Sequence, residues 1–338
     1  MSVRRSIGSA LAPAALGIGL AAAAIASPAA EPPPGVIRAD GAIAIVGNDG
    51  MDAVIAGIGA IVARTHPGMT TAAVLKGSST GLPALAADAT LFAPLAREAW
   101  RGEVAAFRQI RGYDPTPIRV GYSGWGPRAT GKTPPAVYVS KANPIAALSI
   151  ADLSRVFASG SMLGDINLWS QLGVKGEAAE RRIHIYGLRD DGGFATAFRD
   201  RHFGKRPYAA RYEALGSYAS VLRAIAADPY GIGIVGWVDA ARVSDGVRVL
   251  PVAADGRSPA LPSRDAVSAG LYPLSSSLSF YVDRAPGKPL PRLVKDWLEA
   301  ALSDEGQAVV AAEADAEGGY LPLSATDLAA ERAKLAAL

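Results

Sequence analysis

Short apolar runs alternate with amphipathic stretches along the chain after residue 40. Residues 42–46 and 71–75 are short runs with β-branched side chains, which is typical of buried strands. After Met51 the apolar residues recur at helical spacing until His66-Pro67-Gly68 stops the pattern. A loop and a second helical stretch follow the second run. This repeated order of strand, loop and helix predicts an open parallel α/β sheet.

The middle and the end of the chain continue this alternation. Ser149-Ile150-Ala151-Asp152 resembles a capping box that opens a helix reaching Phe157. Prolines and glycines over residues 113–135 suggest a connector between two lobes. The pattern also predicts strands at 136–139, 183–186, 232–235 and 278–282, and helices over 217–227 and 290–298.

The N-terminus has the pattern of an export signal. Two arginines precede an apolar stretch over residues 7–26, and Ala24-Ile25-Ala26 offers small residues for cleavage. We therefore expect a signal peptide over 1–30, an extended spacer over 31–40 and a mature protein in the periplasm. A membrane anchor is the alternative interpretation, which the proline and glycines within the stretch disfavour.

Composition excludes several classes of protein. Half of the 338 residues are hydrophobic and 19% are charged, which rules out a disordered chain. The 34 basic and 31 acidic residues give a net charge of +3 without a long basic run, so we expect no nucleic-acid partner. Cysteine is absent and the three histidines are widely spaced, so we expect no disulfide, metal or other cofactor.

Small-residue loops follow the predicted strands at 47–51, 77–82 and 189–196. Such a loop points its backbone N–H groups at the crevice, and the dipole of the following helix adds partial positive charge, so an anion is favoured there. Arg97 and Arg189 lie near these loops in the sequence and can complete an anion site through bidentate hydrogen bonds. The pattern therefore predicts anion binding without a large basic patch.

One of these loops allows a different chemistry. Gly77-Ser78-Ser79-Thr80-Gly81 follows a predicted strand and matches the G-x-S-x-G pattern of a nucleophile elbow. In that interpretation Ser79 is the nucleophile of a secreted serine hydrolase, with His184 or His202 as its base. Both histidines lie far from the C-terminus, where such a base is usual, so we favour the binding function.

Motifs in the second half carry a family resemblance. From about residue 43 to 323 the chain resembles the substrate-binding proteins of bacterial phosphate ABC transporters, the PstS-like family. The resemblance implies a two-lobe type II periplasmic-binding-protein fold, in which helices flank a mostly parallel sheet in each lobe. It rests most on Tyr272-Pro273-Leu274-Ser275, Phe280-Tyr281-Val282, Leu302-Ser303-Asp304-Glu305-Gly306-Gln307 and Gly319-Tyr320-Leu321-Pro322-Leu323.

The resemblance implies an organisation and a role. Lobe 1 would comprise residues 41–117 and 283–325, lobe 2 residues 118–282, and a helical tail 326–338. The protein would be a monomeric binder rather than an enzyme. It would close on phosphate or a similar oxyanion and deliver it to an ABC permease. Hinge closure around the ligand would be the state that the permease recognises.

The ligand site that the resemblance implies falls on three loops and one arginine. Four hydroxyl residues of the family's first and third loops are replaced here by Asn48, Gly50, Gly192 and Phe194. Another anion or a larger organic acid is therefore the alternative ligand. The implied ligand-binding residues are Asn48, Asp49, Gly50, Met51, Ser78, Ser79, Thr80, Arg97, Arg189, Gly192 and Gly193.

Overall fold

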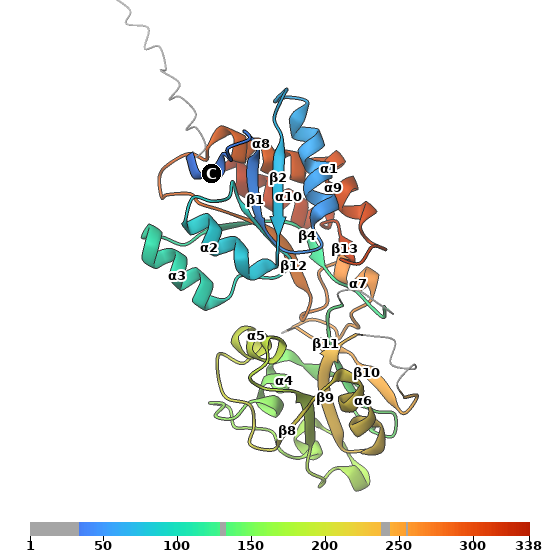
Figure 1. Cartoon of the computed structure of the whole chain (residues 1–338). Helices are drawn as coiled ribbons and strands as arrows, with labels where there is room; N and C mark the ends of the chain where they lie inside the picture. The colour runs from blue at the N-terminus through green and yellow to red at the C-terminus, as the bar shows by residue number, and fades with distance from the viewer. Residues whose placement is uncertain (1–33, 129–132, 238–243, 255) are drawn as a thin grey trace, which may run out of the picture.

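The computed structural model describes residues 34–128, 133–237, 244–254 and 256–338, which form two lobes (Figure 1). The expected signal peptide and the first residues of the spacer lie outside the described residues. No helix within those four ranges is long and apolar enough to cross a membrane.

Lobe 1 combines a parallel strand pair, β1-β2, with a sheet of order β13-β4-β12-β3. A backbone hydrogen bond from Asn48 N to Pro94 O (2.8 Å) joins the strand pair to this sheet. The strands are β1 Ile43–Gly47, β2 Thr71–Leu75, β3 Ala93–Leu95, β4 Thr116–Ser123, β12 Ser276–Val282 and β13 Tyr320–Leu321. The helices are α1 Asp52–Ala63, α2 Gly81–Ala86, α3 Arg101–Arg111, α8 Arg292–Leu302, α9 Asp304–Ala312 and α10 Ala325–Ala336, with short 3-10 turns η1 Pro34–Val36 and η2 Ser78–Thr80.

Lobe 2 is formed by the middle of the chain around a sheet of order β10-β5-β9-β7-β8, with a small β11-β6 pair beside it. The strands are β5 Pro135–Ser140, β6 Leu148–Ser149, β7 His184–Leu188, β8 Tyr212–Leu215, β9 Gly231–Gly236, β10 Val247–Leu250 and β11 Val252–Ala253. The helices are α4 Ile150–Phe157, α5 Gly193–His202 and α6 Tyr218–Ala227, with 3-10 turns η3 Trp169–Leu172 and η4 Gly176–Ala178. A further helix, α7 Arg264–Ser268, lies on the return to lobe 1.

Serine side chains cap the first turns of several of these helices. The Ser149 hydroxyl accepts a hydrogen bond from Asp152 N (3.0 Å) at the start of α4, which confirms the predicted cap. The same contact begins α6, α7, α9 and α10, where the serines are Ser217, Ser263, Ser303 and Ser324.

The two-lobe α/β fold is confirmed, but its sheets are mixed rather than mostly parallel. β1 pairs with β2, and β7 with β8 and β9, in parallel register, whereas β12 pairs antiparallel with both β3 and β4. The reason lies in the path of the chain. β4 leads out of lobe 1 and β12 leads back into it, so the two strands run in opposite directions.

This pairing also corrects the predicted lobe boundaries at 117 and 282. β4 continues to Ser123 and β12 begins at Ser276, so lobe 1 extends beyond both predicted boundaries. Proline at position 117 is tolerated inside β4 because β13 pairs only with Tyr122 and Ser123 and leaves the edge open at Pro117. The tail also belongs to lobe 1, since α10 packs on α8 and β4 and buries Leu335.

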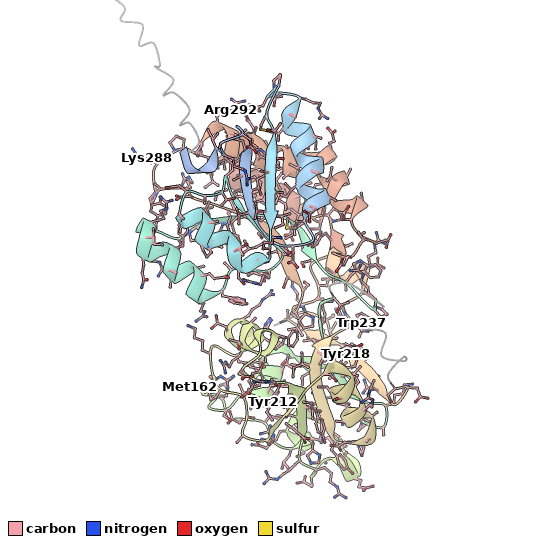
Figure 2. All side chains as sticks on the ribbon, in the orientation of Figure 1. Met162, Tyr212, Tyr218, Trp237, Lys288 and Arg292 are labelled. Atoms are coloured by element: carbon pink, nitrogen blue, oxygen red, sulfur yellow. The ribbon has the colours of Figure 1, made fainter. Side chains whose placement is uncertain are left out.

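The two connections lie side by side and are hydrogen-bonded to each other. Gly126 N donates to Pro262 O (3.0 Å), and the Tyr272 hydroxyl donates to Pro135 O (2.7 Å). Trp237, which continues from β9 beside these connections, donates its backbone N–H to Pro134 O (2.9 Å; Figure 2). Tyr272 therefore links the start of lobe 2 to the returning segment.

One C-terminal motif of the family resemblance has a structural explanation. Ser303 caps α9, and a Cβ at Gly306 would lie 2.0 Å from Ala300 O, so only glycine fits this close approach. The Gln307 amide donates to Val120 O (3.0 Å) and Ala301 O (2.9 Å), and its oxygen accepts from Leu323 N (2.9 Å). The motif thus fastens α9 to the central strand of lobe 1.

Candidate functional site

Two of the predicted loops meet at one edge of lobe 1. Gly47 and Leu75 are paired at the ends of the parallel strands β1 and β2, so the loops that follow both strands leave the same edge. Gly77 N donates to Gly47 O (2.9 Å) and holds the loops together. Gly77 has a φ of 124°, which disfavours any other residue.

The side chains at both ends of the 48–51 loop are buried in lobe 1. Asn48 is 3% exposed and Met51 is fully buried at the start of α1. Their side chains therefore fix the position of the loop, while Asp49 and Gly50 between them are exposed. The substitution of Asn48 for the family's hydroxyl residue thus falls on a buried position.

The second loop faces Arg97. The Ser78 hydroxyl accepts a hydrogen bond from Ala96 N (3.3 Å), and the Ser79 hydroxyl accepts one from Arg97 Nη2 (3.2 Å). The Thr80 hydroxyl donates to Gly77 O (2.8 Å) and closes the turn. We call residues 77–82 the hydroxyl loop. The structure brings this loop and Arg97 together, as predicted.

Arg97 is held by more partners than the sequence indicates. Its Nη1 and Nη2 atoms form a bidentate pair with Glu103 (2.9 and 2.7 Å), and Nη1 also donates to Glu98 O (3.1 Å). The guanidinium lies 3.9 Å from the centre of the Trp100 ring. These contacts fix its orientation beside Ser79, and Glu103 balances its charge.

The predicted contribution of lobe 2 is arranged differently. Arg189 pairs with Asp191 (3.0 and 2.7 Å), and its side chain is 74% exposed. Gly192 N donates to Arg189 O (3.0 Å), and Gly193 begins α5. Within the described residues, the cavity that Arg97 lines is not lined by Arg189, Gly192 or Gly193. Phe194 on α5 lines it instead.

That cavity lies between the lobes and has a volume of about 320 Å³. Lobe 1 contributes the segment from Arg97 to Arg101, and lobe 2 contributes α5, which lies across from α3 in Figure 1. Arg97 connects the cavity to the 77–82 loop, because it lines the cavity and its guanidinium contacts the Ser79 hydroxyl.

Sequence reasoning missed a direct link between the lobes. Arg201 at the end of α5 pairs with Glu98 (2.7 Å) and donates to Ser275 O and Ser276 Oγ (both 2.8 Å). Glu98 also accepts hydrogen bonds from the backbone N–H and the hydroxyl of Ser277 (3.2 and 3.3 Å). No local pattern marks Arg201, because its partners are distant in the sequence.

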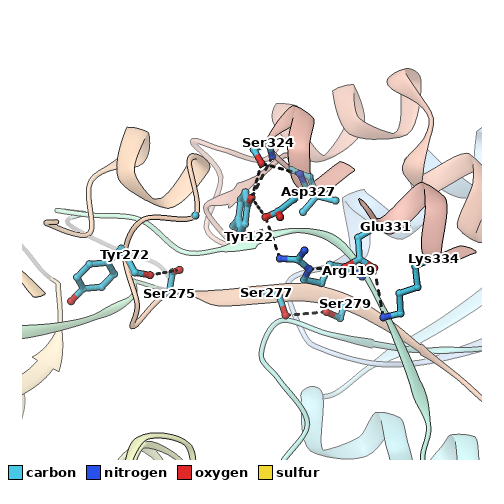
Figure 3. A network of polar contacts seen from close by, with 12 residues as sticks. Arg119, Tyr122, Tyr272, Ser275, Ser277, Ser279, Ser324, Asp327, Glu331 and Lys334 are labelled. Atoms are coloured by element: carbon cyan, nitrogen blue, oxygen red, sulfur yellow. Dashed lines mark hydrogen bonds and ion pairs between the residues drawn. The ribbon is translucent and has the colours of Figure 1, made fainter. Parts of the chain in front are cut away.

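A second, polar cavity of about 620 Å³ adjoins this link. In Figure 3, Arg119 pairs with Glu331 (2.7 Å) and Asp327 (3.2 Å), and the Tyr122 hydroxyl donates to Asp327 (2.6 Å). The hydrogen bond from Tyr122 lowers the pKa of Asp327, and Arg119 lowers it further. This network joins α10 to β4 and lines the cavity with paired charges.

The stability of the protein should depend on pH through His202, which lines the first cavity. Burial, with repulsion from Arg201, lowers the pKa of His202 to about 3 from its ordinary value of 6.5. As the pH falls below 6.5, this histidine is protonated in the unfolded chain before it is protonated in the folded protein. The free energy of unfolding therefore decreases as the pH falls. From pH 7 to 5 the free energy of unfolding should fall by about 2 kcal/mol more in this protein than in His202→Gln. Urea titrations at both pH values measure this difference, and identical pH profiles would contradict it.

Comparisons with known proteins place this geometry in a family. The family model described as a PBP superfamily domain matches residues 28–305. The phosphate-binding protein PstS of Pseudomonas aeruginosa is 28% identical over 268 residues, which are 78% of this chain and 77% of that protein. Crystal structures of PstS from Borrelia burgdorferi and of an ABC-type phosphate transport receptor from Vibrio cholerae share the fold. Each is 16% identical to this chain and covers 83% of it. The TM-scores are 0.55 and 0.50, and the matches cover 98% and 99% of those two chains, respectively. The chain therefore belongs to the PBP superfamily.

Proposed function

We propose that this protein is a periplasmic solute-binding protein that binds an oxyanion, with phosphate as the leading ligand, and delivers it to an ABC permease. The observation that carries the proposal is the meeting of the 48–51 loop, the 77–80 loop and Arg97 beside the cavity between the lobes. The names of the similar proteins support phosphate as the first ligand to test.

The lobe 1 loops supply the donors that an oxyanion needs. The Ser79 hydroxyl lies beside the Arg97 guanidinium, which Glu103 and Trp100 hold in place, and the hydrogen bonds from Thr80 to Gly77 O fix the turn that presents it. A desolvated anion is stable only when most of its oxygens accept hydrogen bonds, and a fixed guanidinium adds charge-assisted ones. Lobe 2 would complete the site as α5 approaches, so that the ligand favours the closed state.

The connections between the lobes suit this closing motion. Hydrogen bonds of Tyr272 and Gly126 hold them to each other, so we propose that they move together when the lobes close. An ABC permease would then distinguish the closed, loaded protein from the open one. The N-terminal sequence supports export to the periplasm, where such a permease takes up its solutes.

The hydrolase alternative receives less support from the geometry. A serine nucleophile needs a general base as its hydrogen-bond partner. The Ser79 hydroxyl accepts a hydrogen bond from the Arg97 guanidinium, which is always protonated and is no base. The proposal is therefore a binder and not an enzyme.

Calorimetric titration with phosphate, sulfate and a small carboxylate tests the proposal directly. We expect phosphate to bind with a dissociation constant of about 1 µM or tighter and the carboxylate at least tenfold more weakly. Small-angle scattering should show a smaller radius of gyration with phosphate present. Absence of binding by all three anions, or turnover of an activated ester that Ser79→Ala abolishes, would overturn the proposal.

A further inference from the structure

We propose that the ligand of this site carries an aromatic group, so that the substrate class is an aryl-substituted oxyanion rather than inorganic phosphate alone. This inference rests on the proposed function, because it places the anionic head group at the lobe 1 loops. It concerns the cavity that lies beside those loops.

The lobe 2 wall of the cavity is a row of rings on one face of α5. Phe194, Phe198 and His202 follow each other at four-residue spacing, which places them on the same side of a helix. The ring centres of Phe194 and Phe198 are 6.1 Å apart, and those of Phe198 and His202 are 4.5 Å apart. Together with Ala197, which also lines the cavity, these residues offer apolar surface against which another ring can pack.

Phe194 is the open end of this row. Its side chain is 36% exposed, while Phe198 beneath it is 5% exposed. Across the cavity stand Ala99 and Trp100 of lobe 1. A phenylalanine at this position has no hydroxyl to donate to an oxyanion, and it adds apolar surface to the cavity.

The charges around the cavity favour an anion. Its carboxylates are neutralised by partners, since Glu98 pairs with Arg201 and Asp200 lies 3.9 Å from Lys205. Arg101 also lines the cavity and, among the described residues, has no hydrogen-bond or ion-pair partner. The uncompensated charge at the rim is therefore positive, next to an apolar wall.

The volume fits a ring attached to the head group. A cavity of roughly 150 Å³ is enough to hold benzene in a protein interior. The 320 Å³ between Trp100 and Phe194 therefore accommodates one phenyl ring and part of its substituents. An aryl phosphonate or aryl phosphate meets all three features: the ring wall, the basic rim and the adjacent hydroxyl loop.

Calorimetry with three probes tests this inference: inorganic phosphate, methylphosphonate and phenylphosphonate. The two phosphonates share a head group, so the ratio of their affinities isolates the ring. We expect phenylphosphonate to bind at least tenfold more tightly than methylphosphonate. Phe194→Thr and Phe194→Leu should reduce this ratio to about threefold or less. Tyr218→Ala, which removes an exposed aromatic residue of lobe 2 outside the cavity, is the matched control and should keep the ratio (Figure 2).

The outcomes separate this inference from the proposed function. If phosphate and methylphosphonate bind but phenylphosphonate binds no more tightly, the inference is overturned and the proposed function stands. If the ratio is high but Phe194→Thr leaves it unchanged, the ring does not lie at α5 and the inference is also overturned. If none of the probes binds, both fail. A ratio that is high in the parent and in Tyr218→Ala, and low in both Phe194 variants, supports the inference.

Discussion

Replacing Arg97 by alanine is expected to weaken phosphate binding ten- to hundredfold, or by about 1.5–3 kcal/mol. The change removes a guanidinium held beside the Ser79 hydroxyl, and it leaves the Glu103 carboxylate, whose side chain is only 12% exposed, without its partner. An unpaired carboxylate near the loop repels an anion in addition to the lost attraction. Calorimetry with phosphate measures the loss.

Two variants make this prediction specific. Adding Glu103→Gln to Arg97→Ala should recover part of the affinity, because it removes the unpaired charge and keeps an acceptor for Trp100 N. Arg189→Ala should cost less than Arg97→Ala, because Arg189 is exposed and already paired with Asp191. An unchanged affinity in Arg97→Ala would remove the lobe 1 loops from the binding site.

Replacing Gln307 by leucine is expected to reduce the free energy of unfolding by about 2–4 kcal/mol. The glutamine is 7% exposed and bonds Val120 O, Ala301 O and Leu323 N, so leucine leaves buried backbone groups without these partners. The expected loss is large because each orphaned group retains its desolvation cost while the fold stays otherwise intact.

Urea unfolding followed by circular dichroism measures this change. Gln109→Leu is the matched control, since Gln109 is exposed on α3 and its replacement should change stability by less than about 0.5 kcal/mol. Equal unfolding midpoints for the Gln307 and Gln109 variants would show that the buried amide does not fasten α9 to lobe 1.

Much of the fold follows from local patterns. The run that forms β1 and the helical spacing that forms α1 lie close to their predicted positions, and Ser149 caps α4 as expected. The direction of a strand, in contrast, does not follow from a local pattern. Whether β12 runs parallel or antiparallel to β4 depends on where the chain crosses between lobes, and no short segment contains that information.

The same distinction applies to the site. The loops at 48–51 and 77–80 converge because consecutive parallel strands end at one edge, a consequence of topology that the repeated pattern already indicates. The aromatic wall behind Phe194 depends on which face α5 turns towards lobe 1. Periodicity places the rings on one side of the helix, but only the packing of the lobes shows what stands opposite them.

The ion pair between Glu98 and Arg201 affects the ratio of closed to open molecules when no ligand is bound. These residues are 103 positions apart and are 41% and 33% exposed, so their attraction is partly screened by water and salt. An ion pair of this kind contributes at most about 1 kcal/mol, which by itself shifts the ratio of closed to open molecules no more than about fivefold. The hydrogen bonds from Arg201 to Ser275 O and Ser276 Oγ add to it. In the proposed function, the ligand would therefore have to outweigh this modest link in setting the closed state, and the modest strength of the ion pair would limit the signal that unloaded, closed molecules give to a permease.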